Sequence, residues 1–373
     1  MKINSNNLDY ESLFRTWRYD TNHISFFKKF FLNSKLIFKV LFLKVKIINS
    51  DKFKNRPKVL YSHNRQDYTV FLNKICNSAS LNISSISYKA SLQHDLGNIR
   101  TAFKYFKSSK IDFHECLLLY FLMKSNDVFF EFIETESVIL LFAEMQLYEN
   151  FLAQLAKQND IYTISFQHGF YVDDNNTSTL NSLNYKNISV DELLVWSPYS
   201  KKLIDKHNPK VKSTIVGRPT THFLSSSHFN FKATKPSCYI GVLDGNQFTE
   251  TNQEIINIAS DLASKVGIAF FLKPHPSQST NITDKYKLLK KSTDLGPNPI
   301  FVGCRSSLLL ELAADKFSCI VIKASPFFNL KNNNHFDHDK IYKELNLEDV
   351  SLYLSNVSPL ADSLITNVIN EHV

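Results

Sequence analysis

FFLKPHP, residues 270–276, is the stretch that decides the fold. The apolar run that begins at Val266 and ends before Lys273 predicts a buried strand of a parallel sheet. The two prolines that follow cannot donate hydrogen bonds to a strand ladder, so the chain has to leave the sheet there. The sequence therefore predicts that Lys273 and His275 lie on a stiff loop at the carboxyl end of a strand.

This loop lies where open α/β sheets bind their ligands, outside the carboxyl ends of the strands. Lysine supplies a fixed positive charge, and histidine supplies a donor that can also carry charge, so Lys273 and His275 together suit a phosphate group. The alternative is a surface turn on which both side chains are only solvated. The stretch by itself leaves both interpretations open.

Buried apolar runs alternate with helical spacing on both sides of this stretch, which is typical of doubly wound parallel sheets. The expected strands are residues 57–61, 81–88, 137–142, 161–166, 193–196, 213–216, 237–242, 299–303 and 318–322. The polar segment from Ser225 to Pro236 predicts a linker. A chain of 373 residues is long enough for two domains, each with its own core.

We therefore expect an α/β protein with three parts. A basic, aromatic extension over residues 1–56 precedes a first α/β domain over 57–228 and a second over 229–373. A terminal helix is expected over residues 352–369, within the second domain.

A second anion-suited feature follows the expected strand 299–303. Ser306 and Ser307 stand at the start of a helix, where free backbone amides and the helix dipole favour an anion. Glu311, one turn further, is placed to accept a hydrogen bond from a ribose hydroxyl. The alternatives are ordinary helix capping for the two serines and a solvated helix face for Glu311. Two such features on neighbouring strands strengthen each other.

The first domain has its own candidate at a strand end. Gln167, His168 and Gly169 follow the expected strand 161–166. Glycine allows a ligand to approach the backbone closely, and a histidine whose pKa lies near neutrality suits a general base. The alternative is a histidine that hydrogen-bonds the turn. The polar residues 171–187 that come next predict a long loop.

The acidic residues and cysteines offer no apparent metal site. Asp191 and Glu192 precede the expected strand 193–196 at its amino end, so we expect both to be exposed to solvent. The turn after strand 237–242 holds a single carboxylate, Asp244. The five cysteines are odd in number and form no CxxC pair, which fits a reducing compartment. We expect metal-independent chemistry and no cofactor.

The net charge of +8 favours an anionic partner. Residues 26–48 interleave six lysines with Phe, Leu, Ile and Val, too often interrupted to span a bilayer. This segment predicts either a helix packed on the domain or contact with a membrane surface. Its lysine-rich character argues against nucleic acid as the partner. Without a secretory signal at the start, we expect a cytoplasmic protein with peripheral contact to the inner membrane.

Four motifs give the chain a resemblance to a known family. They are QHG at 167–169, VGRP at 216–219, KPHP at 273–276 and RSSLLLE at 305–311. In order and spacing they resemble GT-B glycosyltransferases of bacterial surface polysaccharide synthesis, in particular the group of capsule Kdo-transferase-type and CDP-glycerol glycerophosphotransferase-type proteins. The resemblance covers about residues 135–325. Phe170 and Tyr171 depart from the small residue and proline of the glycerophosphotransferase pattern.

The resemblance implies two Rossmann-like domains with a cleft between them, a nucleotide-activated donor bound mainly by the second domain and an acceptor bound mainly by the first. It implies donor contacts from Lys273, His275, Arg305, Ser306, Ser307, Glu311 and Arg218, and acceptor-side positions at Gln167 and Gly169. It makes His168 a catalytic base or an acceptor-positioning group. A double displacement would instead need a nucleophile, for which Glu144 is the nearest candidate by position.

The function implied is transfer of a sugar from a nucleotide donor to a growing surface polysaccharide, whether O-antigen, capsule or lipopolysaccharide. The acceptor would be a glycan or a lipid-linked glycan. The alternative is a non-catalytic partner in a polysaccharide assembly complex that binds a nucleotide or polyanion in the same place.

Overall fold

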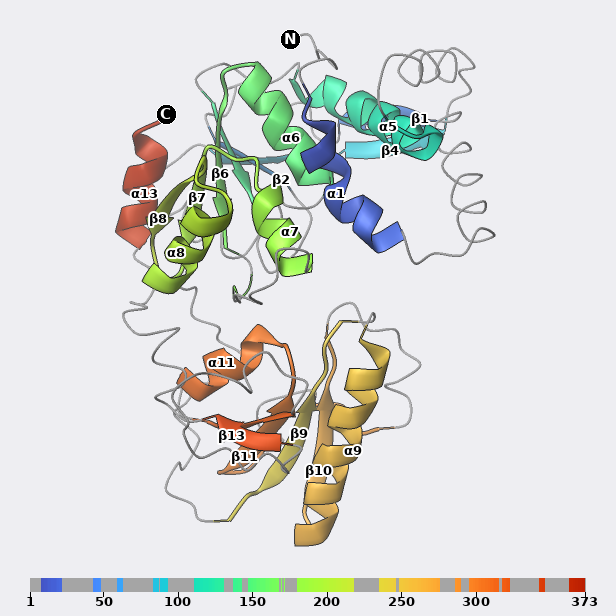
Figure 1. Ribbon diagram of the computed structural model, residues 1–373, viewed down its shortest axis with the longest axis vertical. Helices are drawn as coiled ribbons and strands as arrows, with labels where there is room; N and C mark the ends of the chain where they lie inside the picture. Colours follow the sequence, from blue (N-terminus) through green and yellow to red (C-terminus); the bar gives the residue numbers. More distant parts are fainter. Residues whose placement is uncertain are drawn as a thin grey trace. The chain divides into compact units, whose positions relative to one another are not determined.

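The computed structural model describes a little over half of the chain in separate ranges. These ranges are residues 8–21, 43–47, 59–62, 83–86, 88–92, 111–130, 137–142, 147–167, 169, 171, 180–217, 235–245, 248–275, 286–289, 295–314, 317–322, 342–345 and 362–372. The chain divides into two compact units, Met1–Arg218 with Ser358–Val373, and Pro219–Val357 (Figure 1). We call these the first and the second unit.

The first unit is built on a parallel sheet of six strands in the order β3-β2-β5-β6-β7-β8. Its strands are β2 Val59–Ser62, β3 Ile83–Ile86, β5 Val138–Leu141, β6 Tyr162–Phe166, β7 Glu192–Val195 and β8 Lys212–Ile215. A separate antiparallel pair joins β1 Leu43–Ile47 to β4 Tyr88–Leu92. The parallel sheet confirms the doubly wound pattern expected from the sequence.

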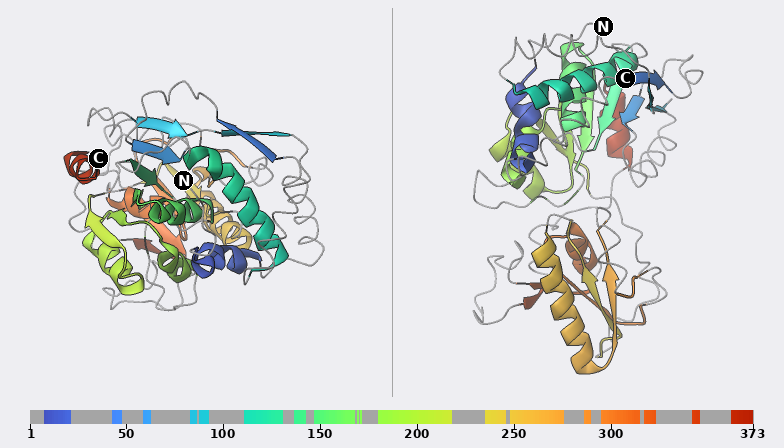
Figure 2. Two further views of the ribbon diagram at one scale, coloured as in Figure 1. Left: turned by 90° about the horizontal axis from the view of Figure 1, so that it is seen from above. Right: turned by 90° about the vertical axis from the view of Figure 1, so that its right-hand side faces the viewer.

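Alternate residues of the central strands point to opposite faces of this sheet, because side chains alternate along a strand. Ile139 and Leu141 pack in one core with helices of the first unit, whereas Val138 and Leu140 pack in another. The helices are α1 Tyr10–Thr21, α5 Phe113–Phe130, α6 Leu147–Gln158, α7 Leu180–Asn187, α8 Pro198–His207 and α13 Asp362–Asn370. Figure 2 shows α1 and α13 on opposite sides of the sheet.

The terminal helix belongs to the first unit, not to the second as the sequence led us to expect. Ile365, Val368 and Ile369 of α13 are buried in the core that contains Val138 and Leu140. An apolar helix face has to cover a sheet face, and nothing in its local sequence states which sheet. The division also falls after Arg218, ten residues before the expected boundary at 228.

Glu192 is fully buried, so the expectation that it is exposed was wrong. Its carboxylate accepts hydrogen bonds from the Tyr162 hydroxyl at 3.0 Å and the Lys212 ammonium at 2.9 Å, and also from the Thr214 hydroxyl. The ring of His372, just after α13, stacks on Tyr162. Flanking strands and the returning C-terminus thus cover a residue that would face solvent at the end of an isolated strand.

Asp191 and the stretch 171–187 also differ from what the sequence led us to expect. Asp191 is half-buried, and its carboxylate accepts from the backbone N–H and the hydroxyl of Thr163 at 2.9 and 2.7 Å. The polar stretch 171–187, expected to be a loop, ends in α7, where Ser182 and Asn187 are buried.

The basic segment 26–48 is described only at its end, where residues 43–47 form β1. Its contact with a membrane stays a prediction. In the part of the chain that the structure describes, no helix has the length and apolar character needed to cross a bilayer.

The second unit holds a five-stranded sheet in the order β10-β9-β11-β12-β13. Its strands are β9 Cys238–Val242, β10 Ala269–Lys273, β11 Pro299–Gly303, β12 Ser318–Ile322 and β13 Tyr342–Leu345. All pair in parallel except β13, which is antiparallel to β12. Helices α9 Thr249–Val266 and α11 Ser307–Ala314 lie on opposite sides of this sheet (Figure 1).

The strand at FFLKPHP begins later than its apolar run suggests. Val266 is the last residue of α9, because Gly267 ends the helix in the left-handed conformation, with a φ of 69°. Glycine adopts this conformation without the steric penalty of a side chain. The side chain of Val266 is exposed and does not belong to the strand. Strand β10 then runs from Ala269 to Lys273, so Lys273 is the last residue of the strand and not part of the loop that follows it, as we had expected.

Candidate functional site

Strands β10, β9 and β11 of the second unit, which lie side by side in that order, end at one level. Lys273 of β10 and Gly303 of β11 are both in register with Val242 of β9, and the N–H of Leu243 donates to the carbonyl of Lys273 at 3.0 Å. The loops that follow therefore leave the sheet along one edge. The structure brings residues 273–275 and the start of α11 to this edge, as the sequence predicts, but β9 lies between β10 and β11, so the two strands are not the neighbours that we expected.

Lys273 and His275 occupy different environments on the KPHP loop. Lys273 ends β10 and is half-buried, and this burial lowers the pKa of its ammonium. His275 is exposed. A half-buried ammonium and an exposed imidazole two residues further along the chain are groups that suit an anionic ligand.

Asp244 is the residue at this edge that sequence reasoning missed. It is only 3% exposed, and both carboxylate oxygens accept from the backbone N–H of Arg305, at 3.1 and 3.3 Å. The backbone N–H of Ser306 also donates to it. Asn252 holds the Asp244 backbone, accepting its N–H at 2.7 Å and donating to its carbonyl at 3.2 Å.

This carboxylate ties the loop after β9 to the loop after β11. The amides that we expected to meet an anion thus already have a partner within the chain, while the Arg305 guanidinium lies 5.2 Å from the centre of the Phe248 ring. We had considered Asp244 only as a metal ligand. The available signal was its position directly after a fully buried strand, at the ligand-binding edge.

Burial raises the pKa of Asp244 to about 6, against the smaller, opposite effect of the Arg305 hydrogen bond. Because the folded state then binds a proton more tightly than the unfolded chain, stability conferred by protonated Asp244 is present below about pH 4 and is lost as the pH rises through about 6. We expect Asp244→Asn to remove this loss of unfolding free energy, which is at most about 3 kcal/mol in the wild type.

Urea unfolding of wild type and Asp244→Asn at pH 4, 5, 6 and 7 checks this expectation. The asparagine oxygen can still accept from the Arg305 amide, so the variant keeps the link between the loops. As the pH rises from 4 to 7, the unfolding free energy of the wild type should fall relative to that of Asp244→Asn. A difference between the two proteins that stays constant across this range would contradict a raised pKa at Asp244.

In the first unit, Gln167 fixes the turn at the carboxyl end of β6. Its side chain is buried, accepts from the N–H of Trp196 at 2.9 Å and donates to the carbonyl of Gly169 at 2.7 Å. No atom lies within 4 Å of the position that a side chain at Gly169 would take, among the residues that the structure describes. Gln167 is thus a positioning residue, and none of the described residues fills the space beside Gly169.

The remaining candidates are not placed in full. Glu144, His168 and Arg218 lie outside the described residues, and the side chains of Ser307 and Glu311 do so too, although both belong to α11. Their roles, like the cleft between the domains, stay predictions. No group of three or more His, Cys, Asp or Glu able to hold a metal ion occurs in the described ranges.

The likeness to solved structures identifies the fold. The UDP-GlcNAc 2-epimerase of Methanocaldococcus jannaschii, solved with UDP-GlcNAc and UDP, superimposes with a TM-score of 0.50 at 11% identity, over 84% of this chain and 99% of that one. The chain has a GT-B fold. No family model matches it, and no curated protein matches it in sequence.

Two other solved structures show a weaker likeness to this GT-B chain. One, described as trehalose-6-phosphate from E. coli bound with UDP-2-fluoro glucose, has a TM-score of 0.45 at 11% identity, over 84% of this chain and 96% of that one. The other is a UDP-forming alpha,alpha-trehalose-phosphate synthase from Burkholderia vietnamiensis, with a TM-score of 0.44 at 10% identity, over 84% and 92%.

Proposed function

We propose that this GT-B protein is a glycosyltransferase that moves a sugar from a nucleotide-activated donor to a growing surface polysaccharide. The observation that carries the proposal is the convergence of Lys273, His275, Arg305 and Ser306 at one edge of the second sheet. This edge is where an open parallel sheet binds a ligand, and its side chains suit a diphosphate. The M. jannaschii structure, of the same fold, contains UDP-GlcNAc and UDP.

The donor phosphates are held by the KPHP loop and the start of α11. Lys273 and His275 contact the phosphates, Arg305 adds a guanidinium, and the hydroxyls of Ser306 and Ser307 donate further hydrogen bonds. The departing nucleotide gains negative charge in the transition state, so donors already fixed around it lower the barrier. From the motif resemblance we also propose that Glu311 accepts from the ribose and that Arg218 contacts the phosphates.

Asp244 shapes this donor site without binding the phosphate itself. Its carboxylate holds the backbone of Arg305 and Ser306, which fixes where their side chains start. A donor phosphate then meets the guanidinium and the hydroxyl rather than the amides that Asp244 occupies. Because two like charges repel, a carboxyl group whose pKa lies near 6 tolerates a neighbouring phosphate better than an ordinary aspartate.

The acceptor lies at the carboxyl end of β6. Gln167 holds the turn that carries His168, and the space beside Gly169 takes a hydroxyl group of the acceptor. His168 takes the proton from that hydroxyl in a single displacement. If the reaction proceeds by double displacement, Glu144 is the nucleophile instead. His168→Ala and Glu144→Gln therefore distinguish the two routes.

The finer identity of the acceptor comes from the motif resemblance. We propose an enzyme of the capsule Kdo-transferase and CDP-glycerol glycerophosphotransferase group, acting without a metal ion on a glycan or lipid-linked glycan in the cytoplasm. The lysines of residues 26–48 would hold it at the inner membrane, close to a lipid-linked acceptor.

Release of free nucleotide from CMP-, CDP-, UDP-, GDP- and dTDP-sugars tests the proposed activity. We expect one class of donor to release nucleotide with wild type in the presence of a saccharide acceptor, and His275→Ala to reduce the rate at least tenfold. A wild-type protein that binds a nucleotide but releases none from any donor would contradict the transferase and favour the non-catalytic partner.

A further inference from the structure

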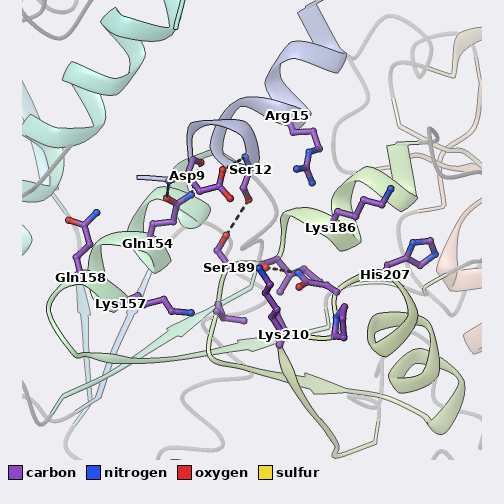
Figure 3. A pocket seen from close by; sticks show the side chains of 15 residues that line it. Asp9, Ser12, Arg15, Gln154, Lys157, Gln158, Lys186, Ser189, His207 and Lys210 are labelled. Atoms are coloured by element: carbon purple, nitrogen blue, oxygen red, sulfur yellow. Dashed lines mark hydrogen bonds between the residues drawn. The ribbon is translucent and has the colours of Figure 1, made fainter. Parts of the chain in front are cut away.

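A polar pocket of about 560 Å³ opens in the first unit (Figure 3), and Gln167 is not among the residues that line it. Its walls come from the C-terminal ends of α6, α7 and α8, from the connections that follow α7 and α8, and from the start of α1. All three helices lead through short connections to the next strand. These connections lead into the amino ends of β6, β7 and β8, whereas Gln167 follows the carboxyl end of β6. Its volume falls in the range of ligand pockets, roughly 300–1,000 Å³.

The pocket carries an excess of positive charge. Arg15, Lys157, Lys186 and Lys210 line it, against one carboxylate, that of Asp9. The Asp9 carboxylate is engaged, because it accepts the backbone N–H of Ser12 at 3.0 Å and caps α1. Arg15 also lies 3.7 Å from the largely exposed carboxylate of Glu11.

Two of these lysines have no counter-ion in the pocket. Within the ranges that the structure describes, no carboxylate forms an ion pair with Lys157 or Lys210. Both side chains, together with Arg15, enter the pocket from different elements (Figure 3). Like charges brought together without a partner repel, so a bound anion would be favoured there.

Helix termini account for only part of this charge. Lys157 and Lys186 lie in the last turns of α6 and α7, where a cation offsets the helix dipole. Arg15 lies near the middle of α1, and Lys210 follows the C-cap of α8, so neither is explained in this way. Their arrival at the same pocket as Lys157 points to a shared anionic ligand.

The floor of the pocket is a fixed polar network. The Asn150 amide donates to the Ser189 hydroxyl at 2.9 Å, and the hydroxyls of Ser189 and Ser12 lie 3.4 Å apart. Gln154 donates to the side-chain oxygen of Asn150 at 2.8 Å. A hydrogen-bonded network of this kind is rigid, so the polar side chains of the pocket are already fixed in position before a ligand binds.

The same lining limits the chemistry of the ligand. No Phe, Tyr or Trp occurs among the described residues around the pocket, so it lacks the aromatic platform on which a nucleobase stacks. Its polar floor is unsuited to a lipid chain, because burying polar groups against hydrocarbon is costly. A ligand with hydroxyl groups and negative charge satisfies both the floor and the cations.

We propose that this pocket binds an anionic carbohydrate, a sugar or short saccharide that carries phosphate or carboxylate groups. Lys157, Lys210 and Arg15 hold the anionic groups, and the sugar hydroxyls face Ser12 and Ser189. Such a ligand is either a free sugar phosphate or the acidic end of a saccharide chain. The site does not depend on the proposed transferase activity, because none of its residues lies at the edge of the second sheet that carries Lys273, His275 and Arg305.

Calorimetric titration of the full chain with glucose 6-phosphate, trigalacturonate and glucose tests the site. The test variant is Lys157→Glu with Lys210→Glu, and the matched control is Lys202→Glu, an exposed lysine of α8 outside the pocket. All proteins also carry His275→Ala, so that binding at the donor edge is weakened throughout. Thermal unfolding establishes that each variant is folded, and Lys157→Gln with Lys210→Gln replaces the test variant if it is not.

We expect at least one anionic probe to bind the protein in which Lys157 and Lys210 are unchanged. Its affinity for the test variant should be at least tenfold lower, and its affinity for the control should differ by less than twofold. Tighter binding of glucose 6-phosphate assigns the site to free sugar phosphates, and tighter binding of trigalacturonate assigns it to chain ends. Equal affinity for glucose, unchanged affinity in the test variant, or no binding of either anion at millimolar concentration would overturn the proposal.

Discussion

Replacing Ile365 and Ile369 by alanine is expected to destabilise the first unit severely. Both side chains are fully buried against the sheet that contains Val138 and Leu140, although they lie more than 200 residues further along the chain. Each replacement removes buried methyl groups and leaves a cavity, which costs about 2–5 kcal/mol. Two such losses approach the whole stability of a typical domain, about 5–15 kcal/mol.

Urea unfolding followed by tryptophan fluorescence measures this effect, because Trp196 lies directly after β7 of the first unit and is buried. Leu364→Ala is the matched control, since Leu364 belongs to the same helix but is 38% exposed. The control should change the unfolding free energy by less than about 1 kcal/mol. Equal effects of the control and of Ile365→Ala with Ile369→Ala would show that α13 does not pack on this sheet.

Lys273→Ala is expected to have the largest effect on nucleotide binding. A charge-assisted hydrogen bond from a lysine to a phosphate contributes about 1.5–3 kcal/mol, so affinity should fall about 10- to 100-fold. Burial lowers the pKa of Lys273, and a bound phosphate favours its charged form. Nucleotide binding should therefore take up protons and weaken as the pH rises toward that pKa.

Titration calorimetry at pH 7 and pH 9 checks both statements. Lys235→Ala is the control, because Lys235 is exposed and precedes β9, at the amino edge of the same sheet. The control should bind nucleotide as wild type does at both pH values. If Lys273→Ala binds the nucleotide as tightly as the wild type does, Lys273 is not part of the nucleotide site.

Local sequence patterns account for elements in both units. The apolar runs 299–303 and 318–322 are β11 and β12, residue for residue. Ser197 caps α8, and its hydroxyl accepts the N–H of Ser200 at 3.2 Å. These elements follow from periodicity and capping, which depend on neighbours within a few residues.

The errors concern contacts between distant parts of the chain. Glu192 is buried only because Tyr162, Thr214 and Lys212 supply partners from neighbouring strands. Asp244 gains its role from the backbone of Arg305, 61 residues later. A carboxylate at a strand end looks the same in the sequence whether solvent or another loop completes its hydrogen bonds, so local patterns could not distinguish the two cases.

A thermal-shift screen of the wild-type chain against CMP, CDP, UDP, GDP and dTDP, repeated with His275→Ala, tests the central claim most directly. A ligand that binds the native state raises the melting temperature by mass action. We predict that one nucleotide stabilises the wild type and has a much smaller effect on His275→Ala. If none of the five raises the melting temperature at millimolar concentration, the assignment of the second unit's edge to a nucleotide donor is contradicted.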